Sequence, residues 1–259
     1  MPDDQSTLGV DRPRLQMQPG AAALAASGGA HPALRPEILQ TLHDAAMRLD
    51  PAAAQSAITR CLGRGVTPED LAELAIPEVA RAMGRSWISD DASFSDVTVC
   101  VARLQSMLRA LGPAWCGDQR AKVSDPAILL AVPHGLDHTL GASVLAGQLR
   151  RGGFSVRLII GASASDLRRR LQHSCYDALL LSVGSSGGLE SARQIVEFLT
   201  RCKESTPPII LGGSVLSCSA DLANRIGADL VTNDLDEVLE YCGLTDHYNA
   251  HIQIRRGLA

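Results

Sequence analysis

The spacing of hydrophobic residues along the chain changes near its middle. From Pro32 to about Leu111 the apolar residues recur at helical intervals, which predicts a run of helices. Asp50-Pro51 and Thr67-Pro68 each place an N-cap residue before a proline at the first helical position, and Pro77 is expected to kink the third helix. The last predicted helix carries one apolar face, formed by Val97, Val101, Leu104, Leu108 and Leu111. Four to five such helices joined by short turns predict a small bundle.

Beyond about residue 126, short apolar runs alternate with helical segments. The runs predicted as strands are 128–132, 156–160, 178–183, 209–211 and 230–231. The predicted helices between and after them are 142–151, 165–173, 189–201, 220–226 and 236–241. Strands that alternate with helices form a parallel sheet covered on both faces. The fold class predicted for the whole chain is therefore α + α/β, with a helical bundle followed by a flavodoxin-like (Rossmann-like) five-stranded parallel sheet.

These patterns divide the chain into five segments. Residues 1–30 are rich in Pro, Gly, Ala, Ser and Gln, and we expect a disordered arm there. The helical bundle spans 31–112, and a linker rich in Gly, Pro and charge follows at 113–125. We expect the α/β domain to occupy 126–246 and a C-terminal tail to occupy 247–259.

Composition and charge exclude several classes of protein. The net charge of -4 argues against a protein that grips nucleic acid strongly by itself, so the arginine clusters at 168–170 and 255–256 are interpreted as solvated surface. The seven cysteines are widely spaced and form no Cys-x-x-Cys pair, which is typical of reduced thiols rather than a zinc site. The first residues lack an apolar core, and no apolar run reaches the ~20 residues that span a bilayer. We therefore expect a cytoplasmic protein that does not enter a membrane.

A loop with two histidines follows the first predicted strand. It contains His134, Asp137 and His138, and Gly141 comes three residues after the second histidine. Ligands of such sheets bind outside the carboxyl ends of the strands, and Gly141 lets the next helix begin close to whatever His138 contacts. This arrangement suits a histidine that ligates the metal of a flat cofactor. An ordinary loop residue or helix cap is the alternative interpretation of His138.

Small residues follow two further strands. Ser182-Val183-Gly184-Ser185 follows the third strand, and Gly212-Gly213-Ser214 follows the fourth. Glycines allow the backbone to lie against a ligand, and the hydroxyls of Ser182, Ser185 and Ser214 suit the polar edges of a buried group. Ordinary turn chemistry explains each loop alone. Their joint position at the ends of three strands, together with the histidine loop, favours one shared binding site.

These motifs resemble the cobalamin-binding domain of methionine synthase, mutases and corrinoid proteins. His138-Thr139-Leu140-Gly141 matches the family's His-x-x-Gly, Ser182-Val183-Gly184 aligns with its Ser-x-Leu, and residues 209–213 match its Gly-Gly strand end. Gly227-Ala228-Asp229, followed by Asp234, is similar to its fifth-strand signature. The resemblance implies that His138 is the lower axial ligand of cobalt, with His134 as the substitute. It implies cofactor contacts by Asp137, His138, Thr139, Leu140, Gly141, Ser182, Val183, Gly184, Ser185, Gly212, Gly213, Ser214 and Thr232.

The chain departs from this family pattern at two positions. The family has an aspartate two residues before the histidine, where it orients the imidazole ring; here that position is Leu136, and Asp137 is adjacent to the histidine instead. The leucine of Ser-x-Leu is replaced by Gly184. The first departure concerns the tuning of the bond to cobalt, and the second concerns the packing of the cofactor's nucleotide tail.

The N-terminal half resembles the helical cap over the upper cobalt face in methionine synthase and in light-sensing regulators. In cobalamin light sensors, a tryptophan at the position of Trp87 is followed ten residues on by Glu-His. Val97-Thr98 occupies those positions here. Trp87, Val97 and Thr98 are therefore candidate cofactor contacts, and a core position in an aromatic-poor bundle is the alternative interpretation of Trp87.

From about residue 35 to 245 the layout is most similar to the AerR/PpaA antirepressors of purple photosynthetic bacteria. The resemblance implies a cobalamin-binding, light-responsive transcriptional regulator that is not an enzyme. Its implied partner is a redox-responsive DNA-binding repressor of photosynthesis genes. Two alternatives remain at this point: a corrinoid methyl-carrier protein of a methyltransferase system, and a heme-binding sensor in which His138 is an axial ligand.

Overall fold

The structure, a computed structural model, describes residues 31–48, 50–116, 124–135, 139–202, 206–218 and 225–257. The arm predicted at 1–30, most of the linker predicted at 113–125 and most of the helix predicted at 220–226 lie outside these residues.

The N-terminal part is helical, as the sequence predicts. Its elements are η1 (Pro32–Leu34), α1 (Pro36–Met47), α2 (Pro51–Leu62), α3 (Pro68–Asp70), η2 (Leu71–Ala75), α4 (Ile76–Ile88) and α5 (Phe94–Cys116). The carboxylate of Asp50 accepts a hydrogen bond from the N–H of Ala52 at 2.9 Å, and the Thr67 hydroxyl accepts one from Asp70 at 3.1 Å. Both predicted caps are therefore confirmed. The irregularity expected at Pro77 is the π-helical turn η2 directly before α4, since proline removes one backbone donor.

The last helix of the bundle extends further than the sequence indicates. Gly112 breaks it with φ 31° and ψ -118°, but a further helical turn continues to Cys116. Trp115 in this turn is 2% exposed. Residues 113–116, for which the sequence predicts a linker, are therefore part of α5, and the tryptophan in this segment belongs to the core.

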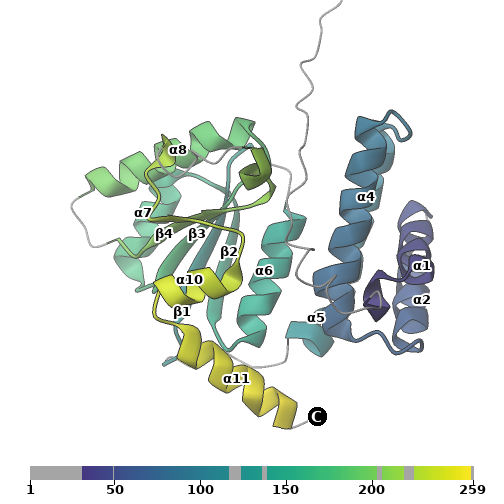
Figure 1. Ribbon diagram of the computed structural model, residues 1–259. Coiled ribbons are helices and arrows are strands. Elements are labelled where there is room, and N and C mark those ends of the chain that lie inside the picture. The colour runs from purple at the N-terminus through teal and green to yellow at the C-terminus, as the bar shows by residue number, and fades with distance from the viewer. Residues whose placement is uncertain are drawn as a thin grey trace, which may run out of the picture.

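The C-terminal part alternates strands and helices around a parallel sheet (Figure 1). Its elements are β1 (Ala127–Pro133), α6 (Leu140–Arg151), β2 (Ser155–Ala162), α7 (Ala164–His173), β3 (Ala178–Ser182), α8 (Gly187–Arg201), β4 (Ile209–Gly212), η3 (Ser214–Cys218), β5 (Leu230–Val231), α10 (Leu235–Tyr241) and α11 (Thr245–Gly257). The strand order is β2-β1-β3-β4-β5, and every pairing is parallel. The predicted fold class and all five predicted strands are confirmed.

Two acidic residues fix the beginnings of central strands. The Asp177 carboxylate accepts the N–H of Ala127 at 2.7 Å, and the Asp229 carboxylate accepts the N–H of Ile209 at 2.7 Å. Each aspartate thus satisfies the first donor of the neighbouring strand, which would otherwise lack a partner. Asp229 therefore lies at the amino end of the sheet, opposite the edge at which ligands of this fold class bind.

Helix α6 belongs to two hydrophobic cores at once. Leu140 and Val144 pack in the core of the helical bundle. The sheet core contains the residues on its other face, Ala142, Ala146 and Leu149. Because one helix supplies both cores, its position is set by the bundle as well as by the sheet.

The C-terminal segment is a helix, although we expected a tail from residue 247. His247 and Tyr248 of α11 lie against Phe154, with ring centroids 5.1 and 6.3 Å from it. A His247 ring nitrogen also lies 3.1 Å from the carbonyl oxygen of Gly153. These contacts dock α11 on the α/β domain at the turn between α6 and β2, so the segment is not a free tail.

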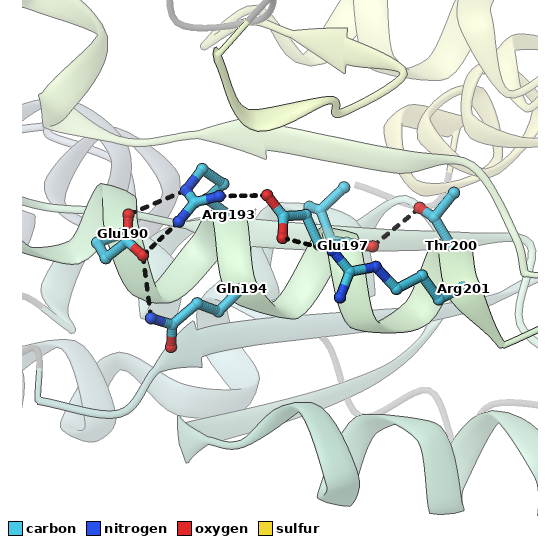
Figure 2. Close-up of polar contacts among 7 residues, drawn as sticks. Glu190, Arg193, Gln194, Glu197, Thr200 and Arg201 are labelled. Atoms are coloured by element: carbon cyan, nitrogen blue, oxygen red, sulfur yellow. Dashed lines mark hydrogen bonds and ion pairs between the residues drawn. The ribbon is translucent and has the colours of Figure 1, made fainter.

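The outer face of α8 carries a ladder of ion pairs (Figure 2). Arg193 binds Glu190 with two guanidinium nitrogens, at 2.6 and 2.9 Å, and it also contacts Glu197 one turn further on. Hydrogen bonds from Arg193 and Gln194 hold the pKa of Glu190 below its usual range. Exposed pairs of this kind contribute little to stability, and this face is a solvated surface.

Candidate functional site

The histidine loop begins at the carboxyl end of β1. His134 is exposed, and its backbone N–H donates a hydrogen bond to the carbonyl oxygen of Ala162 at 3.2 Å. Gly135 follows with φ 82°, a conformation that favours glycine. Leu136, Asp137 and His138 lie outside the described residues. The metal ligand predicted at His138 is therefore not tested by the geometry.

The other three residues of the His-x-x-Gly motif, Thr139, Leu140 and Gly141, have different surroundings. The Thr139 hydroxyl accepts a hydrogen bond from Gln105 Nε2 of α5 at 2.7 Å. Leu140 is 9% exposed and packs in the bundle core, and its contact with a cofactor stays a prediction. A Cβ placed on Gly141 would have no heavy atom of the described residues within 4 Å, so these residues leave open space beside the first turn of α6.

The loops after β3 and β4 are joined to each other. The N–H of Val183 donates to the carbonyl oxygen of Gly212 at 2.8 Å, and the Ser214 hydroxyl donates to the carbonyl oxygen of Gly184 at 2.8 Å. Gly213 has φ 118°, and a Cβ on it would lie 2.2 Å from the carbonyl oxygen of Val183. We expected this glycine to let the backbone approach a ligand. The structure shows that the backbone of the neighbouring loop also leaves no room for a side chain there, and the approach to a ligand stays a prediction.

Asn233, after the end of β5, binds the backbone of the loop that follows β4. Its carboxamide oxygen accepts the N–H of Gly213 at 2.6 Å, and its nitrogen donates to the Gly213 carbonyl oxygen at 3.1 Å. Thr232 lies beside Gly212, since a Cβ on that glycine would be 2.8 Å from the Thr232 carbonyl oxygen. Asp234 caps α10 by accepting the N–H of Asp236. Sequence reasoning missed Asn233, although its position two residues after the end of β5 was a usable signal.

The serines at this edge differ in their hydrogen bonding. Ser182 pairs with Gly212 in the sheet register and is half-buried, and Ser185 is also half-buried in the following loop. Among the described residues, the hydroxyls of Ser182 and Ser185 have no hydrogen-bond partner, whereas that of Ser214 is occupied by the Gly184 carbonyl. Ser182 and Ser185 are thus the hydroxyls available to a ligand.

The candidates on the helical bundle lie at the turn between α4 and α5. Trp87 is 50% exposed, and its ring meets that of Phe94 edge-to-face with centroids 6.4 Å apart. Phe94 itself is 71% exposed. The interpretation of Trp87 as a core residue is therefore wrong. Val97 packs partly into the bundle core, while Thr98 is exposed and its hydroxyl donates to the Phe94 carbonyl oxygen at 2.8 Å.

Helix α5 projects past the carboxyl edge of the sheet. Gln105 contacts Thr139 and Trp115 contacts Gly147, so α5 and α6 run in the same direction. Helix α5 begins eleven residues before Gln105, which places Phe94 about 16 Å beyond the start of α6 at 1.5 Å per residue. Figure 1 shows the α4–α5 turn at the same end of the molecule as the start of α6. The exposed aromatic pair thus stands beside the edge that carries the predicted site loops.

A separate hollow of about 380 Å³ lies between β2 and α7. It is lined by Arg157, Arg169, Arg170, His173, Ser174 and Tyr176. None of the predicted site residues contributes to it, and Arg169 is paired with Asp166 at 2.5 Å. Within the described ranges, no cluster of three His, Cys, Asp or Glu side chains is suited to hold a metal ion. The same part of the chain contains no helix long and apolar enough to span a membrane.

Comparison with known proteins gives three results. The B12 binding domain family matches residues 126–240. The uncharacterized 20.5 kDa protein of the bchF-crtJ intergenic region of Rhodobacter capsulatus is 39% identical over 174 residues, which cover 67% of this chain and 91% of that protein. The Methanosarcina barkeri monomethylamine corrinoid protein shares the fold, with a TM-score of 0.66 at 16% identity over 81% of this chain and 98% of that one. This chain therefore belongs, with the Rhodobacter capsulatus protein, to the AerR/PpaA-type family, whose α/β part is a B12-binding domain.

Proposed function

We propose that this protein binds cobalamin at the carboxyl edge of its sheet and acts as a light-responsive regulator without catalytic turnover. The observation that carries the proposal is the projection of α5, which places the exposed rings of Trp87 and Phe94 beside that edge. Two large aromatic side chains exposed together suit contact with a ligand or partner. The relative encoded in a photosynthesis gene region supports a role in regulating those genes.

The described residues fit a corrin. Within the part of the chain that the structure describes, Gly141 leaves open space at the start of α6, and the half-buried Ser182 and Ser185 have no hydrogen-bond partner for their hydroxyls. Asn233 holds the loop after β4 in a fixed position, so that edge is preorganised. His138 is our proposed lower ligand of cobalt, because it follows β1 and directly precedes Thr139 and α6; His134, which is exposed, is the substitute. When bound, an alkylcobalamin supplies a cobalt–carbon bond that light cleaves.

The protein's own residues would then report the state of the upper cobalt face. Trp87 and Phe94 lie on either side of the turn that joins α4 to α5, and in this proposal they would face the upper side of the bound corrin. A change in the size of the upper ligand alters their contacts, and the helices that carry them offer a route by which the signal reaches the rest of the bundle. The expected output is altered binding to a DNA-binding repressor of photosynthesis genes.

The first test is the visible spectrum of the purified full chain. We would add hydroxo-, methyl- and adenosylcobalamin in the dark and after illumination, with hemin in parallel. A bound corrin whose spectrum changes on illumination supports the proposal. The His138→Ala variant should lose cobalamin or hold it in its base-on form, while His173→Ala, at an exposed position on α7, should behave as the wild type.

Four outcomes would contradict the proposal, two of them the assignment of His138 and two of them the regulatory function. An unchanged spectrum in His138→Ala removes that residue as ligand, and an effect of His134→Ala alone transfers the role to the substitute. Uptake of hemin without corrin favours a heme sensor. Uptake of methylcobalamin that is stable to light, with transfer of its methyl group to a methyltransferase partner, favours a carrier.

The second test concerns the partner. The repressor's affinity for a photosynthesis promoter fragment is measured with and without the cobalamin-loaded protein, in the dark and after illumination. A light-dependent change in that affinity supports the proposed regulation. Trp87→Ala should retain cobalamin yet weaken the light-dependent change, because the ring is exposed and fills no part of the core. Equal repressor affinity in all conditions would contradict the regulatory role.

A further inference from the structure

We propose that Gln105 of α5 is a positioning residue for the cofactor loop, so that the helical bundle sets how the lower ligand of cobalt is held. This inference rests on the proposed function. Gln105 Nε2 donates to Thr139 Oγ1 at 2.7 Å across 34 residues of sequence, and the contact is partly buried. Thr139 directly follows His138 in the chain. The hydrogen bond therefore anchors the end of the histidine loop to the bundle.

Thr139 is the junction between the loop, the bundle and α6. Its hydroxyl accepts from Gln105, while its carbonyl oxygen accepts both the N–H of Ser143 at 3.0 Å and the Ser143 hydroxyl at 2.9 Å. The residue is thereby fixed on both sides. The position two before the histidine is Leu136, which has no hydrogen-bonding group to orient the ring. Restraint of the loop through Thr139 gives the bundle a means of controlling the ligand's position.

The other end of α6 is anchored independently. Glu73 of η2 accepts hydrogen bonds from Trp115 Nε1 at 2.8 Å, Gln148 Nε2 at 3.1 Å and an Arg151 guanidinium nitrogen at 2.5 Å. These contacts, with Leu140 and Val144 in the bundle core, hold α6 in place without Gln105. Loss of the Gln105 side chain should consequently release the loop and leave the helix docked.

The test compares Gln105→Ala with Gln105→Glu, whose carboxylate accepts a hydrogen bond from the Thr139 hydroxyl and so restores the link. Ser106→Ala is the matched control, since Ser106 is exposed on the next position of the same helix and contacts Arg109. Three quantities are measured on the full chain: the melting temperature of the unloaded protein, amide exchange at residues 139–143, and the affinity and visible spectrum of bound hydroxocobalamin.

We expect Gln105→Ala to melt near the wild-type temperature but to exchange the amides at 139–143 faster. Its affinity for hydroxocobalamin should fall about tenfold, the effect of one partly buried hydrogen bond, and its spectrum should shift toward the base-on form. Gln105→Glu should recover most of this loss. Thr139→Val removes the same bond from the other side, so combining it with Gln105→Ala should add little.

The inference is overturned if Gln105→Ala matches Ser106→Ala in exchange, affinity and spectrum. It is also overturned if the variant loses affinity only because its melting temperature collapses, which would make Gln105 a purely structural residue. If the wild type takes up no corrin, the proposed function fails and the cofactor role of Gln105 fails with it. Amide exchange then separates the two failures, because unchanged exchange in Gln105→Ala shows that the loop anchor itself is absent.

Discussion

The indole ring of Trp115 occupies the place where a side chain on Gly147 would have to be. A Cβ on that glycine would lie 2.1 Å from the Cη2 atom of Trp115. The ring cannot move freely, because its Nε1 donates to Glu73 at 2.8 Å and the residue is 2% exposed. One aromatic side chain therefore brings together the end of α5, the π-helical turn η2 and the middle of α6.

This contact predicts that Gly147→Ala destabilises the fold, although alanine is the better helix former. The added methyl group overlaps a ring that has no free space, so we expect a loss of about 1–3 kcal/mol in the free energy of unfolding. Urea unfolding followed by tryptophan fluorescence measures the change. Gly84→Ala is the control: its Cβ would have nothing within 4 Å in α4, so it should raise stability by about 0.5–1 kcal/mol. Equal effects of the two substitutions would contradict the packing shown here.

Glu73 is expected to be a strong determinant of stability. Its side chain is 15% exposed and pairs with Arg151, which is 19% exposed, so removing the charge leaves a poorly solvated guanidinium without its partner. Glu73→Gln should lower the free energy of unfolding by about 3 kcal/mol. Glu190→Gln, in the exposed ladder of α8, should change it by less than about 1 kcal/mol.

A double-mutant cycle separates the ion pair from the other contacts of Glu73. Arg151→Met removes the guanidinium, so Glu73→Gln in that background should cost much less than it does alone. Additive losses would show that the carboxylate acts through Trp115 and Gln148 rather than through Arg151.

The sheet and the bundle were predictable because their signals are local. Each strand is an apolar run bounded by polar residues, and the caps at Asp50 and Thr67 depend on the nearest residues alone. Thr232, Gly212 and Gly213 could be placed at one edge because the carboxyl ends of parallel strands meet there.

The features that escaped prediction depend on contacts between distant parts of the chain. Trp115 follows a glycine and precedes a polar stretch, so its segment resembles a linker until Gly147 is brought against it. Gln105 is one polar residue within an amphipathic helix, and nothing local connects it to Thr139. The close packing of Gly213 escaped prediction for the same reason, since the obstacle to a side chain there is the backbone of Val183 in another loop.

The cysteines should differ sharply in reactivity. Burial raises the pKa of the Cys100 thiol to about 11, and it also raises the pKa of Cys61; both side chains are buried. Cys175 is exposed. At pH 8 the buried thiols stay protonated, so iodoacetamide should label Cys175 within minutes and spare Cys61 and Cys100 until the protein is unfolded. Peptide mass mapping with and without urea measures this, and rapid labelling of Cys100 in the folded protein would contradict the bundle core described here.

The last prediction separates ligand binding from folding at two glycines. Gly213→Ala places a Cβ 2.2 Å from the Val183 carbonyl oxygen at φ 118°, so it should lose stability by about 2 kcal/mol or more and lose cobalamin binding with it. Among the described residues, Gly141→Leu meets no atom within 4 Å of its Cβ, so the unloaded protein should unfold within about 0.5 kcal/mol of the wild type. If a corrin lies against the start of α6, the leucine blocks it, and binding measured by visible titration should fall more than tenfold. Wild-type affinity in Gly141→Leu would place the cofactor away from α6 and would remove the steric basis of the proposed site.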